Sequence, residues 1–222
     1  MTMHRLRFAA CALAGLALMA GCSSDKTQTD GWTQARAALA TLTAKRSTAP
    51  IDPGLTRAQV DASPLPLILL TVENRNATAA LARVSTNAGT ETFITSDGTT
   101  VTTRDGVLIS TRGLGSDLMS AAVPSRAQIS AGSGSHRRVH DHLDGGDVTV
   151  RHAFDCTLAG AGSETVTVVG LSWPTRVVSE SCTGDSGTFE NRYWIDSRGI
   201  FRQSRQWVGA DVGFLRLSAT SR

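Results

Sequence analysis

The stretch FENRYWIDSRGIFRQSRQWV, residues 189–208, shows most clearly which fold this chain adopts. Phe189, Tyr193 and Ile195 stand at odd positions, so they share one face of an extended strand, where side chains alternate between faces. Residues 196–199 supply a turn in which Gly199 can adopt a positive φ, and residues 200–208 run back. The stretch therefore predicts an antiparallel hairpin.

The same pattern continues outward along the chain. From Leu65 onward, turn-forming Gly, Asn and Asp residues separate short runs rich in β-branched side chains, which is typical of an all-β protein. We expect a mainly β fold with one antiparallel meander, folded as a bent sheet, a half-barrel or a sandwich. Three helices are expected as well: an amphipathic N-terminal helix over 32–44, a short helix over 56–62, and another near 116–121, capped by Ser116.

The N-terminus predicts export and lipidation. A basic start with Arg5 and Arg7 is followed by an apolar run that is shorter than the roughly 20 residues of a spanning helix. The run ends in LMAGC, residues 18–22, which resembles the lipobox of bacterial lipoproteins. We therefore expect a signal peptide over 1–21, a lipidated tether over 22–31 attached through Cys22, and a single β-rich domain over 32–222. The alternative is an ordinary signal peptide with a chance cysteine.

The charge of the chain argues against nucleic-acid binding. Removing Arg5 and Arg7 with the signal peptide leaves 20 of the 22 Lys and Arg side chains against 19 Asp and Glu. The arginines are also scattered rather than clustered, so the electrostatic footprint of a nucleic-acid-binding protein is missing.

Two cysteines are expected to pair. Cys11 leaves with the signal peptide and Cys22 carries the lipid, so Cys156 and Cys182 are the remaining thiols in an oxidising compartment. We predict a disulfide between them. The alternative is two separate buried thiols.

Two motifs suggest catalysis, but neither is complete. CTGDSG, residues 182–187, resembles the nucleophile segment of trypsin-like proteases, but the residues after it differ from that family. The first histidine after the signal peptide is His136, which is too close in sequence to Ser186 for a histidine base in the trypsin-like fold. We interpret the motif as a hairpin loop.

Four histidines, His136, His140, His142 and His152, form the second cluster. A two-residue turn at 145–146 would place His140 opposite Arg151 and turn His152 to the other face of the sheet, so that only His140 and His142 could approach one ion. Zinc needs three or four protein ligands. We therefore predict solvated histidines and no metal site.

Aromatic side chains offer a possible surface for sugar rings. Trp173, Tyr193, Trp194 and Trp207 could form a stacking platform, with Trp194 pointing outward because its parity is opposite to that of Tyr193. The alternative is that these rings pack within the protein. No pair of carboxylates can be assigned to glycoside hydrolysis from the sequence.

The segment TRDGVLISTRGLGSDLM, residues 103–119, resembles a block of the YjbF/GfcB lipoprotein family. Further resemblances are the lipobox, an LDG hairpin at 143–145 and the closing stretches 189–196 and 204–207. The resemblance implies an antiparallel β domain in a lipoprotein of group 4 capsule or exopolysaccharide production, without established catalytic residues. Within the block, the charged positions are read as turn-forming residues or as a surface for a partner. These positions are Arg104, Asp105, Arg112 and Asp117.

Together these observations predict a noncatalytic, lipid-anchored accessory protein of exopolysaccharide or capsule export, located at the outer membrane and facing the periplasm. No catalytic, cofactor-binding or metal-binding residue is assigned. The expected partners are the membrane, through the lipid, and polysaccharide export proteins. A polysaccharide-binding module that uses exposed aromatic residues is the alternative, and a periplasmic hydrolase is a third possibility.

Overall fold

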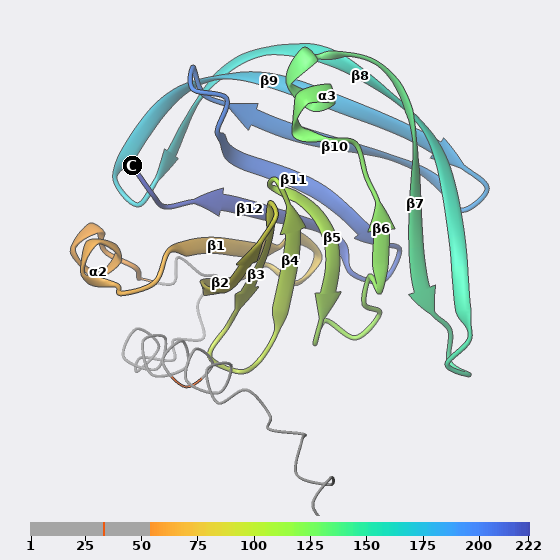
Figure 1. Ribbon diagram of the computed structural model, residues 1–222, viewed down its shortest axis with the longest axis horizontal. Coiled ribbons are helices and arrows are strands. Elements are labelled where there is room, and N and C mark those ends of the chain that lie inside the picture. The colour runs from red at the N-terminus through yellow and green to blue at the C-terminus, as the bar shows by residue number, and fades with distance from the viewer. Residues whose placement is uncertain (1–32, 34–53) are drawn as a thin grey trace, which may run out of the picture. The chain divides into compact units, whose positions relative to one another are not determined.

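The computed structural model of the protein describes Thr33 and residues 54–222, and the residues from 54 onward belong to one compact unit (Figure 1). Twelve strands of this described part form one antiparallel sheet. The strands are β1 (Leu67–Val72), β2 (Ala77–Asn87), β3 (Thr90–Ile94), β4 (Thr100–Arg104), β5 (Val107–Arg112), β6 (Ser120–Ala122), β7 (Ser133–Leu143), β8 (Thr149–Val168), β9 (Leu171–Gly184), β10 (Gly187–Ile195), β11 (Phe201–Gly209) and β12 (Gly213–Ala219). The expectation of a mainly β fold is confirmed.

The sheet curls into a nearly closed barrel. Its strand order is β5-β4-β3-β2-β1-β12-β11-β10-β9-β8-β7-β6, so each strand pairs with the next one along the chain, except at β5 and β6, and β12 pairs with β1. The two edges of the sheet are therefore consecutive strands. The segment between them closes much of the gap, because the Thr111 amide donates to the Leu118 carbonyl at 2.9 Å and the Met119 amide donates to the Asp141 carbonyl at 2.8 Å.

Within residues 54–222, two short α-helices and one 3₁₀ turn accompany the sheet. α2 (Arg57–Ala62) and α3 (Arg126–Ala131) both begin with a capping box, and η1 (Glu73–Arg75) joins β1 to β2. The helix expected over 56–62 is confirmed. The expected helix over 32–44 lies outside the described residues, apart from Thr33, as do the predicted signal peptide and tether. Among the described residues, no helix is long and apolar enough to cross a membrane.

The helix expected near 116–121 is wrong. The Asp117 carboxylate accepts hydrogen bonds from the Gly113 and Leu114 amides and from the Thr111 hydroxyl, at 2.8, 3.1 and 2.8 Å. Residues 116–119 form no helix, and residues 120–122 are strand β6. Asp117 therefore closes a loop where the sequence suggested the first turn of a helix.

Both faces of the curved sheet carry buried side chains. On the inner face, contacts cross the barrel: the Gln206 side chain of β11 accepts from the Leu108 amide at 2.9 Å and donates to the Gly106 carbonyl at 3.1 Å. On the outer face, Trp194 packs with Leu69 of β1 and with valines at the end of the long β8–β9 hairpin.

The prediction that Trp194 points outward into solvent is therefore wrong. Its side chain is on the outer face, but the β8–β9 hairpin covers that face and leaves Trp194 only 5% exposed. Its indole Nε1 donates to Glu164 of the same hairpin at 2.8 Å. The alternation of side chains along β10 correctly places Trp194 and Tyr193 on opposite faces of the strand. Only the tertiary packing shows that both of these side chains are buried.

The hairpin expected from the opening stretch is confirmed, because β10 and β11 pair antiparallel around a turn in which Gly199 has a φ of +78°. The register expected for the histidine hairpin is wrong by one residue: His140 lies opposite His152, and Asp141 lies opposite Arg151. The turn there is longer than two residues, since Asp144 Oδ1 accepts from the Gly146 and Val148 amides.

Candidate functional site: the inner face of the barrel

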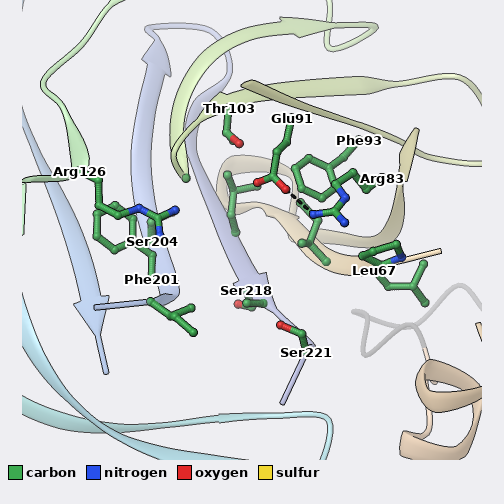
Figure 2. Close-up of a pocket in the computed structure, with 16 residues that line it drawn as sticks. Leu67, Arg83, Glu91, Phe93, Thr103, Arg126, Phe201, Ser204, Ser218 and Ser221 are labelled. Atoms are coloured by element: carbon green, nitrogen blue, oxygen red, sulfur yellow. Dashed lines mark hydrogen bonds and ion pairs between the residues drawn. The ribbon is translucent and has the colours of Figure 1, made fainter. Parts of the chain in front are cut away.

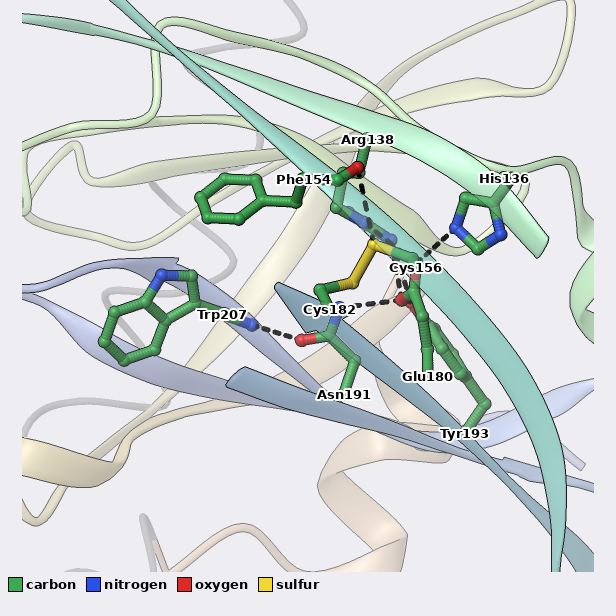
Figure 3. The surroundings of a disulfide bond; sticks show 9 residues. All are labelled: His136, Arg138, Phe154, Cys156, Glu180, Cys182, Asn191, Tyr193 and Trp207. Carbon is green, nitrogen blue, oxygen red and sulfur yellow. Dashed lines mark hydrogen bonds and ion pairs between the residues drawn. A yellow bond between two sulfur atoms is a disulfide. The ribbon is translucent and has the colours of Figure 1, made fainter. Parts of the chain in front are cut away.

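A buried carboxylate lies on the inner face among side chains of β7, β9 and β10 (Figure 3). Glu180 of β9 is fully buried and receives hydrogen bonds from strands on both sides. The Arg138 guanidinium of β7 donates to both carboxylate oxygens, at 3.0 and 2.9 Å, and Tyr193 and Asn191 of β10 donate to Oε2 at 2.8 and 2.7 Å. His136 Nε2 lies 2.7 Å from Oε1. These five residues form what we call the Glu180 cluster.

The electrostatics of the Glu180 cluster favour a permanent ion pair. Burial by itself would raise the pKa of Glu180, but the charge of Arg138 and the hydrogen bonds from His136, Arg138 and Asn191 hold it well below its usual range. Burial, together with the negative charge of Glu180, raises the pKa of the Tyr193 hydroxyl well above its usual value. Glu180 is therefore ionised and Tyr193 neutral at any physiological pH, so neither can exchange a proton easily.

The predicted disulfide is confirmed beside this cluster. Cys156 of β8 and Cys182 of β9 lie directly opposite one another and are joined by an S–S bond, and both are buried (Figure 3). One ligand atom each from His136, Cys156 and Glu180 lie within 4.8 Å of one another. The sulfur of Cys156 is already bonded to Cys182, and Glu180 is already paired with Arg138. We therefore assign this group a structural role and not a metal-binding one.

A pocket of about 250 Å³ opens at one end of the inner face. Its walls carry three of the four clustered histidines, which come from the ends of β7 and β8 that meet at the histidine hairpin. We call it the histidine pocket, and its lining comprises Ser116, His140, His142, Leu143, His152, Phe154, Ser186, Trp207, Gly209, Ala210 and Asp211. The corrected register explains the gathering, because residues directly opposite one another on paired strands share a face.

The imidazoles of this pocket differ in their surroundings. His140 is buried between the rings of Phe154 and Phe189, with ring centroids 5.5 and 5.9 Å away, and burial lowers its pKa to about 3. The pKa of His142 is lowered as well, by burial first. The expectation of solvated histidines is wrong for His140 and for His136, whose side chain is buried against Glu180, while His142 and His152 are partly exposed.

A second pocket, of about 180 Å³, lies at the opposite end of the barrel (Figure 2). Arg83 and Glu91 form an ion pair across β2 and β3 in its wall. Arg126 of α3 lies over the Phe201 ring, with its guanidinium carbon 5.2 Å from the centroid, and donates to the Asp105 carbonyl at 2.9 Å. The charged groups of this pocket are thus engaged with the protein itself.

The four charged residues of the 103–119 block do not form one cluster. Arg104 and Asp105 belong to the β4–β5 turn, whereas Arg112 and Asp117 lie at the far end of β5. Arg112 donates to the carbonyls of Thr111, Leu118 and Met119, so it holds the loop that Asp117 closes. Asp105 has a φ of +51° and is exposed in its turn. Their use by a partner stays a prediction.

The protease-like segment forms the β9–β10 turn, as expected. Ser186 lines the histidine pocket, but within the described part of the chain its hydroxyl makes no hydrogen bond to an imidazole. A nucleophilic serine requires a base within hydrogen-bonding reach, and the segment lacks that partner here.

Sequence reasoning missed the Glu180 cluster, although one signal pointed to it. If Cys156 and Cys182 are opposed on neighbouring strands, then Glu180 shares the inner face with Cys182, and an acidic residue on a buried face requires a cationic partner. Alternation along β7 puts His136 and Arg138 on the same face.

The described residues thus form a β protein of one class, a nearly closed antiparallel barrel with an internally paired ionic cluster and a disulfide. Residues 33–219 match the family described as group 4 capsule polysaccharide lipoprotein gfcB, YjbF, and the chain belongs to this family. As a member of a lipoprotein family, it is assigned to the cell envelope.

The chain is also similar to two known proteins. The chain is 34% identical over 131 residues to the uncharacterized lipoprotein YjbF of Escherichia coli (strain K12), a match that covers 55% of this chain and 60% of that protein. The crystal structure of the hypothetical lipoprotein YmcC from Escherichia coli (K12) superimposes with a TM-score of 0.67 at 19% identity, covering 76% of this chain and 89% of that one. The second likeness concerns the fold alone.

Proposed function

We propose that this protein is a noncatalytic accessory lipoprotein of capsule or exopolysaccharide production and export. In this proposal, lipid on Cys22 anchors it to the outer membrane, the barrel faces the periplasm, and polysaccharide export proteins are its partners. Stable anchoring requires more than one acyl chain, which a lipidated N-terminal cysteine supplies.

The family membership carries this proposal, and the inner face of the barrel supports its noncatalytic part. Both oxygens of Glu180 are occupied by donors from the protein, and Ser186 has no histidine in hydrogen-bonding reach within the described residues. General acid–base catalysis requires a group that is free to exchange a proton near neutral pH, and Glu180, held ionised by Arg138, is not such a group. The barrel core instead uses its charges to hold neighbouring strands together.

Deleting the gene in the bacterium that encodes the protein tests the proposal. We expect surface polysaccharide to fall and to return when the wild-type gene is restored. A Cys22→Ala variant should fail to restore it, because it cannot be lipidated. Cys11→Ala is the matched control, since we place this cysteine in the discarded signal peptide. Unchanged polymer in the deletion strain would overturn the proposal, and full rescue by Cys22→Ala would overturn its anchoring part.

A polysaccharide-binding role is the second candidate, and the placement of Trp207 favours it. Trp207 is partly exposed in the wall of the histidine pocket and stacks on Phe189, with ring centroids 5.9 Å apart. An aromatic ring at the mouth of a pocket suits a sugar ring. Calorimetric titration with oligosaccharides of the bacterium's own polymer tests this role, and binding that is unchanged by Trp207→Ala would exclude this surface.

A further inference from the structure

The histidine pocket brings three imidazoles near one another at one end of the barrel. His140 and His142 alternate along β7 and so share its inner face, and His152 of β8 lies directly opposite His140. The ring centroids of His140 and His142 are 6.2 Å apart, and those of His142 and His152 are 5.9 Å apart. A His-x-His pair with a third histidine on the neighbouring strand thus converges at one end of the barrel.

One of these imidazoles has a buried nitrogen without a partner, which calls for a ligand. His140 is only 1% exposed, and its Nε2 has no hydrogen-bond partner although it is buried in the pocket wall. Buried polar atoms are nearly always satisfied, so an unpaired one points to a missing ligand. His142 Nδ1 donates to the Asp117 carbonyl at 3.1 Å, and the backbone of Val208 is a second hydrogen-bond partner of this ring, so an ion bound at Nε2 competes with the Val208 contact.

The His142 contact matches a general feature of metal sites. A metal-ligating histidine almost always donates its other N–H to a carbonyl or carboxylate, which fixes the tautomer and the ring orientation. The Asp117 carbonyl is available for this because the Asp117 side chain holds the loop between β5 and β6. The loop that replaces the expected helix therefore also positions a histidine.

From this geometry we propose that the histidine pocket binds one divalent transition-metal ion, with zinc as the first candidate, through His140, His142 and His152. Imidazole nitrogens suit zinc, which prefers four ligands at about 2.0–2.1 Å. The ligand nitrogens of the three rings do not all lie within 4.8 Å of one another, so the partly exposed His142 and His152 rings must rotate toward the buried His140, and the pocket of about 250 Å³ gives them room. Asp211 is the one carboxylate among the lining residues and offers a fourth ligand.

Metal binding by the full-length chain tests the proposal directly. The protein is purified in detergent with a histidine-free tag, stripped with EDTA and titrated with Zn²⁺. We expect one ion per chain by elemental analysis after gel filtration. His142→Ala and His152→Ala should each weaken binding by at least about tenfold, because even second-shell changes cost 10- to 100-fold in metal affinity. Arg151→Gln is the matched control, since this exposed residue lies beside His152 on the other face of β8 and should leave binding unchanged.

A readout on the unaltered protein covers the case in which the variants do not fold. Zn²⁺ should shift the imidazole nitrogen resonances of His140, His142 and His152 and leave those of His136 in place. The proposal is overturned if no stoichiometric zinc is retained, if folded His142→Ala and His152→Ala variants bind it as well as the wild type, or if His136 is the residue that responds. These outcomes are independent of surface polysaccharide, so they do not depend on the proposed accessory role.

Discussion

Replacing Glu180 with glutamine is predicted to destabilise the barrel by about 3–5 kcal/mol, the usual cost of breaking a buried ion pair by removing one partner. The magnitude follows from the contacts. Donors from Arg138, Asn191 and Tyr193 converge on Oε2, and a further Arg138 donor and His136 face Oε1. A glutamine has one acceptor oxygen and one donor group in place of two acceptors. Donors would therefore face an NH₂ group, and the Arg138 guanidinium, 1% exposed, would lose its counter-ion.

The assay is urea denaturation of wild type and variants at neutral pH. Glu190→Gln is the matched control, because Glu190 on the adjacent strand pairs with Arg192 at 2.8 Å while the two side chains are 45% and 42% exposed. Such an exposed pair contributes only about 0–1 kcal/mol. The double variant Arg138→Met/Glu180→Leu should recover only part of the loss, because apolar residues can replace the ion pair but leave His136, Asn191 and Tyr193 without their shared acceptor. A loss below about 1 kcal/mol for Glu180→Gln would refute the reasoning.

The same carboxylate predicts how stability depends on pH. The pKa of Glu180 is lowered in the folded protein, so the unfolded chain binds the extra proton first as the pH falls. Its contribution is therefore complete above the ordinary glutamate pKa near 4.5 and is progressively lost as the pH falls below that value. We expect the free energy of unfolding to decrease below pH 4.5 in the wild type, and to do so less steeply in Glu180→Gln.

Three further changes have defined outcomes. Replacing both Cys156 and Cys182 with serine should lower the free energy of unfolding by about 3.5 kcal/mol from chain entropy alone, since the disulfide closes a sequence separation of 26. Adding reductant during a melt should destabilise the wild type by the same amount and should leave the serine variant unchanged. Gly184→Ala should lower the free energy of unfolding by about 1–3 kcal/mol, because the new Cβ would lie 2.2 Å from the Ala153 carbonyl oxygen. Gly160→Ala is the control: no atom lies within 4 Å of its new Cβ, so the urea midpoint should stay nearly unchanged. Trp194→Ala should destabilise the protein by about 3–5 kcal/mol; a melting temperature equal to that of the wild type would mean that this tryptophan is not packed as described.

Much of the architecture follows from local sequence. Alternating β-branched residues and recurrent turn residues predicted the antiparallel strands, and the stretch 189–208 predicted the β10–β11 hairpin that the structure contains. The pairing of Cys156 with Cys182 followed from the cysteine count and the expected compartment. The family resemblance rested on residues 103–119 and agrees with the match over 33–219. These features depend on neighbouring residues or on composition, so no knowledge of long-range contacts was needed.

The candidate site depended on single-residue details that local patterns leave open. Counting the histidine hairpin turn as two residues put His152 on the wrong face, because a register shift of one residue reverses every side chain. The hydrogen bonds of Asp144 decide the true turn and bring His140 and His152 together.

The amino-acid sequence by itself determined the strands, most of their order and the disulfide, because alternation, turn residues and cysteine chemistry act over short distances or through composition. Only the tertiary structure decided which faces are buried. Closing the sheet puts Glu180 and Arg138 in a shared interior, and the β8–β9 hairpin covers Trp194 on the outside. Burial is a property of surfaces brought together from distant parts of the chain, and for that reason the ionic cluster and the histidine pocket became visible only in the folded barrel.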